Sequence, residues 1–176
     1  ICKDEIKDEL SLEEIKKFFN KRLFDKLKTL AFSGGEVLLR LDIVDVIKYF
    51  IDTKKNLQEI LIASNGLAPQ LILKKTGDIL FHIKKNNLNI NLTVQVSCDG
   101  LNEKADVVRG IPGTFRKVDY LVDNLIELRK KHANLIVKIC FLILPVNVTE
   151  IDRVVGYANQ KKIGCQISHL FISSKY

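Results

Sequence analysis

The chain has 176 residues, of which 47% are hydrophobic and 28% charged, a composition typical of one globular domain with a sizeable core. It contains no apolar run long enough to span a membrane and no signal peptide, so neither a membrane protein nor a secreted precursor is predicted. Its net charge of +7 comes from basic residues spread over helix faces, without a block interleaved with aromatic residues. We therefore interpret this charge as a solvated surface and do not expect a nucleic-acid partner.

The first helix is expected just after the start of the chain. Ser11 and Glu14 form a capping box, and the helix that follows is expected to carry Ile15, Phe18, Phe19 and Leu23 on one face. Apolar periodicity then predicts strands that alternate with helices. The strands are expected within LKTLAFS, LQEILIAS, INLTVQVS, LIVKICFLIL and GCQISHLF. The helices between them are expected at about 41–53, 69–85, 114–132 with Thr114 as N-cap, and from about 149.

Repeated strand–helix units of this length imply parallel strands with right-handed crossovers. An open doubly wound sheet and a closed or partly closed barrel both remain possible. In the third strand, the polar residues Asn91, Thr93, Gln95, Ser97 and Asp99 alternate with apolar ones. A strand covered by helices on both faces is apolar throughout, whereas one polar face fits a barrel with a polar ligand inside. The alternation therefore favours an α/β barrel.

Four cysteines are present, without the paired spacing of disulfides or zinc sites. Cys98, Cys140 and Cys165 fall in apolar strands, where we expect them to act as small buried hydrophobes. This usage predicts a reducing, cytoplasmic location. The chain has no methionine and begins with Ile1 and Cys2, which predicts a fragment of a longer protein.

Ligands of parallel α/β folds bind at the carboxyl ends of the strands. The expected strands end in FSGGE, SNG, SCDG, LPVN and SHLF. Turn chemistry alone explains Asn65-Gly66. The segment Gly34-Gly35-Glu36, together with Ser97, Asp99 and Arg109 in the loop after the third strand, instead predicts a ligand site. Its backbone donors, two carboxylates and guanidinium fit a zwitterion with an attached ribose.

These segments resemble a known family. FSGGEVLLRLDIVDVI, SNG and VSCDGLNEKADVVRGIPGTFRKV are similar to the core of radical S-adenosylmethionine (radical SAM) enzymes. The likeness is closest to the branch with auxiliary-cluster (SPASM-type) peptide- and cofactor-maturing members. It implies a partial (β/α)6 TIM-like barrel, with five βα units in this chain and the first strand before Ile1. Residues 1–176 would then be a radical SAM core domain fragment, with any C-terminal auxiliary domain absent.

The resemblance also implies a cofactor site. Gly34-Gly35-Glu36 match the motif that holds the methionyl amino group of S-adenosylmethionine, and Ser97 and Asp99 match the strand end near the ribose. Arg109 matches the arginine that commonly faces the methionyl carboxylate, and residues 143–147 match the strand end beside the adenine. The predicted cofactor-binding residues are Ser33, Gly34, Gly35, Glu36, Asn65, Ser97, Asp99, Arg109, Ile143 and Val146. Glu36 is expected to matter for this binding and not for folding.

The chain departs from the family pattern at several positions. Val37 replaces the usual proline of the glycine-rich motif, and Ala105-Asp106 replaces a common His-Asp. The family holds a [4Fe-4S] cluster with a Cys-x3-Cys-x2-Cys loop after its first strand. Cys2 precedes KDEIKDELSLEEI as the third of those cysteines typically precedes the first helix. The resemblance therefore predicts Cys2 as a metal ligand, with the other two cysteines before Ile1; a terminal cysteine without function is the alternative.

The resemblance implies an enzyme that uses a [4Fe-4S] cluster and S-adenosylmethionine to generate a 5′-deoxyadenosyl radical. That radical would abstract hydrogen from a peptide or small-molecule substrate, with electrons from a donor such as flavodoxin or ferredoxin. Two alternatives remain: a cluster-less TIM-like barrel that acts as an anion- or sugar-binding enzyme, and a barrel that is a non-catalytic binding module. The carboxylate of Glu36 argues against a phosphate ligand beside it. Cysteines encoded before Ile1 would separate the radical SAM interpretation from both alternatives.

Overall fold

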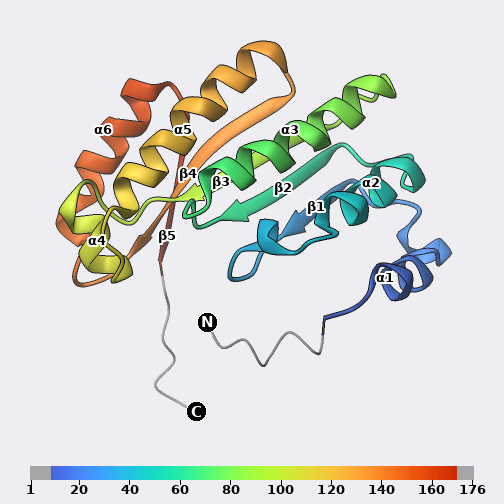
Figure 1. Cartoon of the computed structure of the whole chain (residues 1–176), viewed down its shortest axis with the longest axis horizontal. Coiled ribbons are helices and arrows are strands. Elements are labelled where there is room, and N and C mark those ends of the chain that lie inside the picture. The colour runs from blue at the N-terminus through green and yellow to red at the C-terminus, as the bar shows by residue number, and fades with distance from the viewer. Residues whose placement is uncertain (1–8, 170–176) are drawn as a thin grey trace.

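The computed structural model describes residues 9–169, in which five parallel strands form one sheet in the order β1-β2-β3-β4-β5 (Figure 1). The strands are β1 (Thr29–Phe32), β2 (Glu59–Ser64), β3 (Asn91–Ser97), β4 (Leu135–Ile143) and β5 (Gly164–His169). The helices are α1 (Leu12–Phe19), α2 (Ile43–Thr53), α3 (Pro69–Lys85), α4 (Glu103–Arg109), α5 (Thr114–Lys131) and α6 (Ile151–Lys161). Three 3-10 turns complete the set: η2 (Arg22–Phe24), η3 (Val37–Leu39) and η4 (Val148–Glu150).

The strand order distinguishes between the two sheet architectures. A doubly wound sheet changes its winding direction and places strands that are not consecutive in the chain side by side. Here every hydrogen-bonded pair is consecutive and parallel, from β1 with β2 to β4 with β5. Successive right-handed crossovers of this kind bring the connecting helices to one face of the sheet. Figure 1 shows α2, α3, α5 and α6 together on that face. The predicted α/β class is confirmed, and the described part of the chain is not doubly wound.

The face of the sheet that meets the helices forms the hydrophobic core. Ile60, Val94, Val137 and Phe141 point into it and are buried, together with Phe50 of α2. Burial of this apolar surface is the main stabilising contribution to such a fold. All strand positions on this face lie in register, so the core runs without a break across β2, β3 and β4.

The other face of the sheet, which we call the open face, is partly polar. No helix of residues 9–169 packs over it, since α2, α3, α5 and α6 lie on the opposite side (Figure 1). The polar alternation predicted for β3 is confirmed, because Thr93 and Gln95 point to the open face while Val94 and Val96 enter the core. Thr93 is nevertheless fully buried and Gln95 only 9% exposed.

The three cysteines within the described residues differ in environment. Cys98 is buried in the core, and burial raises the pKa of its thiol to about 12. Cys165 is half-buried at the same face, and Cys140 is half-buried on the open face. The expectation of a small buried hydrophobe is therefore confirmed for Cys98 alone.

The N-terminal helix has the predicted capping box. The backbone N–H of Ser11 donates to Glu14 at 2.8 Å, and the Glu14 N–H donates to the Ser11 hydroxyl at 3.3 Å. Helix α1 ends at Phe19, however, so Leu23 falls in η2 and is 81% exposed. Its expected place on the buried helix face is wrong, because α1 has only eight residues and ends before it reaches Leu23. Phe18 is also half-exposed.

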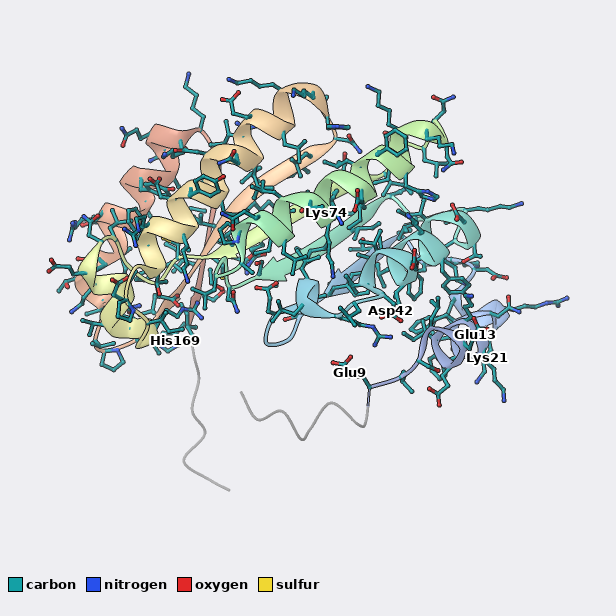
Figure 2. The ribbon with its side chains drawn as sticks, in the orientation of Figure 1. Glu9, Glu13, Lys21, Asp42, Lys74 and His169 are labelled. Carbon is teal, nitrogen blue, oxygen red and sulfur yellow. The ribbon has the colours of Figure 1, made fainter. Side chains whose placement is uncertain are left out.

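Arg40 fastens this N-terminal segment to the loop before α2. Its guanidinium lies 2.6 Å from Asp42 and 3.5 Å from Glu9, and it donates to the carbonyl of Leu10 at 2.7 Å. Figure 2 labels Glu9 and Asp42, which lie on the two segments that Arg40 joins. The hydrogen bond from Arg40 holds the pKa of Asp42 below its usual value.

Two local predictions around α4 are wrong. Helix α4 was not expected, and it places Arg109 at a helix end and not in an open loop. The helix has seven residues and buries only Ala105, so it leaves no clear periodic pattern in the sequence. Thr114 is the first residue of α5 and not its N-cap, which is Gly113 at a φ of 76°.

The basic side chains lie mainly on the outer surface, as Lys21 beyond α1 and Lys74 on α3 illustrate (Figure 2). Within residues 9–169, no helix combines the length and the apolar character that crossing a bilayer requires.

Candidate functional site

The carboxyl ends of β1 and β2 are joined by one carboxylate. Glu36 accepts hydrogen bonds from the Ser64 hydroxyl at 2.9 Å and the Asn65 N–H at 2.8 Å through Oε2. Its Oε1 accepts a longer bond from the Leu38 N–H at 3.4 Å. The Asn65 amide returns a bond to the carbonyl of Gly35 at 3.4 Å. Glu36 and Asn65, both predicted site residues, are therefore brought together, and the carboxylate of Glu36 also has a structural task.

The two glycines before Glu36 are not explained by contacts with residues 9–169. Neither Gly34 nor Gly35 has a positive φ, so neither conformation demands glycine. A Cβ on Gly34 would meet only Val37, at 4.0 Å, and a Cβ on Gly35 would meet nothing within 4 Å. Both residues are exposed, as is Ser33 before them. The strand end thus presents bare backbone to the space above the sheet.

A second cluster lies at the ends of β3 and β4. Asp99 follows β3 and is buried, with its Oδ2 2.5 Å from Nη2 of Arg109. Its Oδ1 accepts the N–H of Leu142 in β4 at 3.0 Å. The side chain of Arg109 is 32% exposed, against 5% for Asp99. The buried carboxylate of Asp99 therefore binds the Arg109 guanidinium on one side, and part of the guanidinium stays exposed to solvent.

The side chain of Asn147 connects the two loops that form this second cluster. Its side chain is fully buried and donates to the carbonyls of Asp99 at 2.9 Å and Leu142 at 3.0 Å. Its oxygen accepts the Leu144 N–H at 2.7 Å. The sequence analysis placed Asn147 at the end of the segment 143–147 but assigned it no contact. A buried amide with these bonds fixes the loop after β4 against the loop after β3.

The other predicted site residues lie at the same edge of the sheet. Ser97 ends β3 and Ile143 ends β4, and both are half-buried. Val146, in the following loop, is 47% exposed. The predicted set is therefore distributed over four neighbouring strand ends, in one cluster around Glu36 and a second around Asp99 and Arg109.

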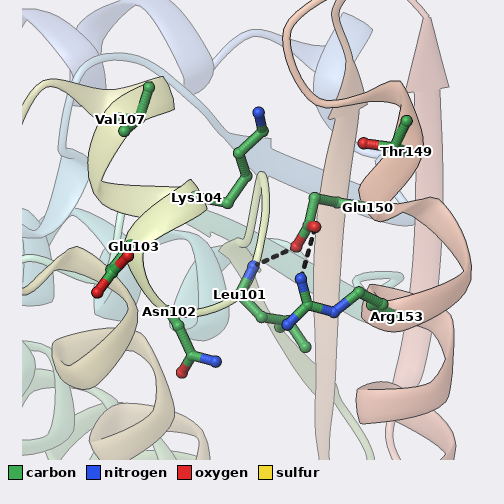
Figure 3. Close-up of a pocket in the computed structure, with 8 residues that line it drawn as sticks. All are labelled: Leu101, Asn102, Glu103, Lys104, Val107, Thr149, Glu150 and Arg153. Atoms are coloured by element: carbon green, nitrogen blue, oxygen red, sulfur yellow. Dashed lines mark hydrogen bonds and ion pairs between the residues drawn. The ribbon is translucent and has the colours of Figure 1, made fainter.

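A pocket of about 690 Å³ lies beside the second cluster, between α4 and the beginning of α6 (Figure 3). Its lining includes Glu150, a buried acid that accepts the Leu101 N–H at 3.2 Å and pairs with Arg153 at 2.7 Å. None of the predicted cofactor-binding residues lines this pocket. The sequence analysis missed Glu150, because a glutamate at the start of an amphipathic helix is usually an exposed first-turn acid.

The described cysteines do not form a metal site. Within residues 9–169, no three His, Cys, Asp or Glu side chains are grouped so that they could hold a metal ion. Cys98 and Cys140 belong to opposite faces of the sheet. Cys2, the predicted cluster ligand, lies outside the described residues. The exposed backbone of Gly34 and Gly35 lies beside the carboxylate of Glu36, and Arg109 belongs to the separate cluster around Asp99. The described residues alone do not fit an iron–sulfur cluster.

The chain matches no protein-family model, and no curated protein matches it significantly.

Proposed function

We propose that this chain is the core of a radical SAM enzyme and that the carboxyl edge of its sheet binds S-adenosylmethionine. The observation that carries the proposal is the exposed backbone of Gly34 and Gly35, which neither φ nor packing explains. A ligand that lies directly against the main chain is a physical reason for two adjacent glycines. The carboxylate of Glu36 follows at once and suits the ammonium of a methionyl group.

The arrangement of the sheet supports a partial barrel. Consecutive parallel strands with their helices on one face form the unit from which βα barrels are built. Thr93 and Gln95 are buried although no described helix lies over them, which is consistent with a sheet curved toward its open face. We assign the open face to the interior of this partial barrel.

The two clusters receive different parts of the cofactor in this proposal. Glu36 takes the amino group, and Arg109 takes the carboxylate through N–H groups that Asp99 does not occupy. Asp99 orients Arg109 through Oδ2 and accepts the Leu142 N–H through Oδ1, and in this proposal it lies near the ribose together with Ser97. Ser97, Asn65, Ile143 and Val146 line the remaining rim.

S-adenosylmethionine supplies, once reductively cleaved, the radical that removes hydrogen from a substrate. The chain's own residues bind and orient the cofactor and keep water from the reacting atoms. Cys2, together with two cysteines encoded before Ile1, would hold the cluster. A cytoplasmic location, an electron donor of the flavodoxin or ferredoxin type, and a peptide or small-molecule substrate complete the proposal.

Substitution of Gly35 tests the binding site. In the complete protein, Gly35→Val places a side chain where the cofactor would lie, so we expect calorimetry to show a loss of S-adenosylmethionine affinity of roughly tenfold or more. Thermal unfolding should change little, because Gly35 is exposed and an added Cβ there meets nothing within 4 Å. Gly77→Val on α3 is the control of equal size for cofactor affinity, since an added Cβ on Gly77 also meets nothing within 4 Å.

Full cofactor affinity in Gly35→Val would remove the glycine pair from the site. The residues encoded before Ile1 provide an independent test of the cluster. If they contain the two missing cysteines, the reconstituted protein should bind a [4Fe-4S] cluster and lose it on Cys2→Ala. If they contain none, the enzymatic proposal fails and a binding module is the better interpretation.

A further inference from the structure

Two polar side chains meet in the middle of the open face. Gln95 of β3 and Lys138 of β4 are register partners, so their Cα atoms lie about 4.8 Å apart and both side chains point to the same side. Gln95 is 9% exposed, and its amide makes no hydrogen bond to another residue of 9–169. The amide atoms keep some contact with solvent, since Thr76 alone among these residues has a fully buried side-chain oxygen without a partner. The amide is therefore available to a ligand that reaches the open face.

Lys138 also lacks a partner. It is half-buried and forms no ion pair with a described residue. Among the strand residues of the open face, Glu59 is the one carboxylate within the described part. It begins β2, two strands away from Lys138, and accepts a hydrogen bond from Thr93 at 3.2 Å. Within the described part of the chain, the Lys138 ammonium is thus a positive charge on a partly polar surface with no carboxylate beside it.

Gly164 of β5 shows that the fold makes room for this lysine. Gly164 is the register partner of Lys138 on the other side, and a Cβ there would come within 2.8 Å of the Lys138 Cγ. Any larger residue would push the lysine stem out of place. Glycine weakens a strand, and its φ here is not positive, so the close approach of Lys138 is the reason for it.

We propose that Gln95 and Lys138 form a carboxylate-binding site for a small organic acid. The ammonium of Lys138 contacts one oxygen, and the amide N–H of Gln95 donates to the other. One cation and one neutral donor match a single negative charge better than a phosphate dianion. The half-buried position favours a small molecule. The site rests on the proposed function in one respect: if the open face is the barrel interior, the acid is the enzyme's substrate.

Nuclear magnetic resonance of the chain tests the site directly. Propionate is the probe, propionamide is its neutral isostere, and sodium chloride controls for ionic strength. We expect propionate to shift the Lys138 ε-methylene and Gln95 side-chain amide signals together, with one saturable binding curve. Propionamide and chloride should produce no saturable shift. The signals are assigned from Lys138→Gln and Gln95→Leu, each checked for an intact backbone spectrum.

Variants distinguish binding at Gln95 and Lys138 from nonspecific binding of propionate to surface lysines. Lys138→Gln should abolish saturable propionate binding, and Gln95→Leu should weaken it by roughly fivefold or more. Lys74→Gln removes the same charge from an exposed position on α3 and should leave binding intact. Shifts that are linear and equal for all lysines would overturn the proposal. So would an unchanged affinity in Gln95→Leu, or tighter binding of inorganic phosphate than of propionate.

The carboxylate that binds Gln95 and Lys138 could also be the methionyl carboxylate of S-adenosylmethionine, and a further comparison of variants tests this. If Lys138→Gln lowers S-adenosylmethionine affinity as strongly as Arg109→Ala does, the site serves the methionyl carboxylate and the substrate assignment is wrong. Retained cofactor affinity with lost propionate binding supports the substrate assignment. If the wild-type protein binds propionate but not S-adenosylmethionine, the proposed function fails while the carboxylate site stands.

Discussion

The carboxylate of Asp99 lies 2.5 Å from the guanidinium of Arg109, and the ion pair joins the end of β3 to the last residue of α4. The same carboxylate accepts the N–H of Leu142 at 3.0 Å and so reaches β4 as well. One buried side chain therefore fixes both the strand end and the direction of the half-exposed arginine. Its removal should loosen the loop and free Arg109.

Asp99→Ala should destabilise the fold by about 2–3 kcal/mol, because Leu142 loses its acceptor and the ion pair is lost. Asp99→Asn keeps an acceptor for Leu142 and removes only the charge, so we expect a smaller loss of about 1–2 kcal/mol. Urea unfolding of both variants measures the difference. Equal stability of Asp99→Ala and the wild type would show that the buried contacts contribute nothing.

Arg109→Lys separates charge from geometry at the cofactor site. A lysine can still pair with Asp99, so we expect stability within about 1 kcal/mol of wild type. It lacks the planar fork that lets arginine hold Asp99 and a second carboxylate at once. Calorimetry should therefore show a loss of S-adenosylmethionine affinity close to that of Arg109→Ala. Full affinity in Arg109→Lys would mean that no bidentate contact is made.

Glu36→Ala should affect folding as well as binding. The sequence analysis expected a role in binding alone, but the carboxylate accepts the Ser64 hydroxyl and the Asn65 N–H across the first two strand ends. Ser64 is buried, so the loss of its acceptor should cost about 1–2 kcal/mol. Thermal or urea unfolding checks this value. Glu13→Ala on α1 provides an exposed control that loses only a surface ion pair with Lys16.

Helices and strands are predicted correctly from the sequence where the periodic pattern of apolar residues extends over many positions. Each of the five strands and the helices after Pro69 and near Thr114 are found, because their apolar residues repeat over many positions. Helix α4 was missed, because seven residues with one buried side chain carry no such repeat. Leu23 was misplaced since the end of α1 depends on a local turn and not on periodicity.

The candidate site was also predicted only in part: its residues were identified, but the contacts between them were not. Glycines and acids at strand ends identify Glu36, Asp99 and Arg109 as residues of the carboxyl edge, because parallel topology alone brings strand ends together. The contacts between these side chains depend on the conformations of the loops, which the spacing of residues in the sequence does not determine. The Asp99–Arg109 pair and the bridging role of Asn147 became visible only with the folded loops after β3 and β4.

The N-terminal end of α5 provides a pH-dependent test. Asp106 accepts the N–H of Gly113 at 2.6 Å and that of Phe115 at 3.4 Å, and the bond from Gly113 is the main reason that the pKa of Asp106 is lowered. A carboxyl group whose pKa is lower in the folded than in the unfolded state stabilises the fold above its unfolded pKa, near 3.9. This contribution is lost as pH falls through the lower, folded value.

Asp106→Asn should therefore be less stable than wild type at pH 7, and the gap should narrow as pH falls below about 4. Urea unfolding at a series of pH values measures both curves. Asp78→Asn on α3 is the control, because Asp78 is exposed and makes no hydrogen bond to another residue of 9–169. At pH 7 its stability should stay close to that of wild type, because no hydrogen bond is lost. In Asp106→Asn, the asparagine oxygen can still accept one N–H. If the difference in unfolding free energy between Asp106→Asn and wild type stays constant from pH 7 to pH 3, the negative charge of Asp106 does not contribute to the stability of this helix end.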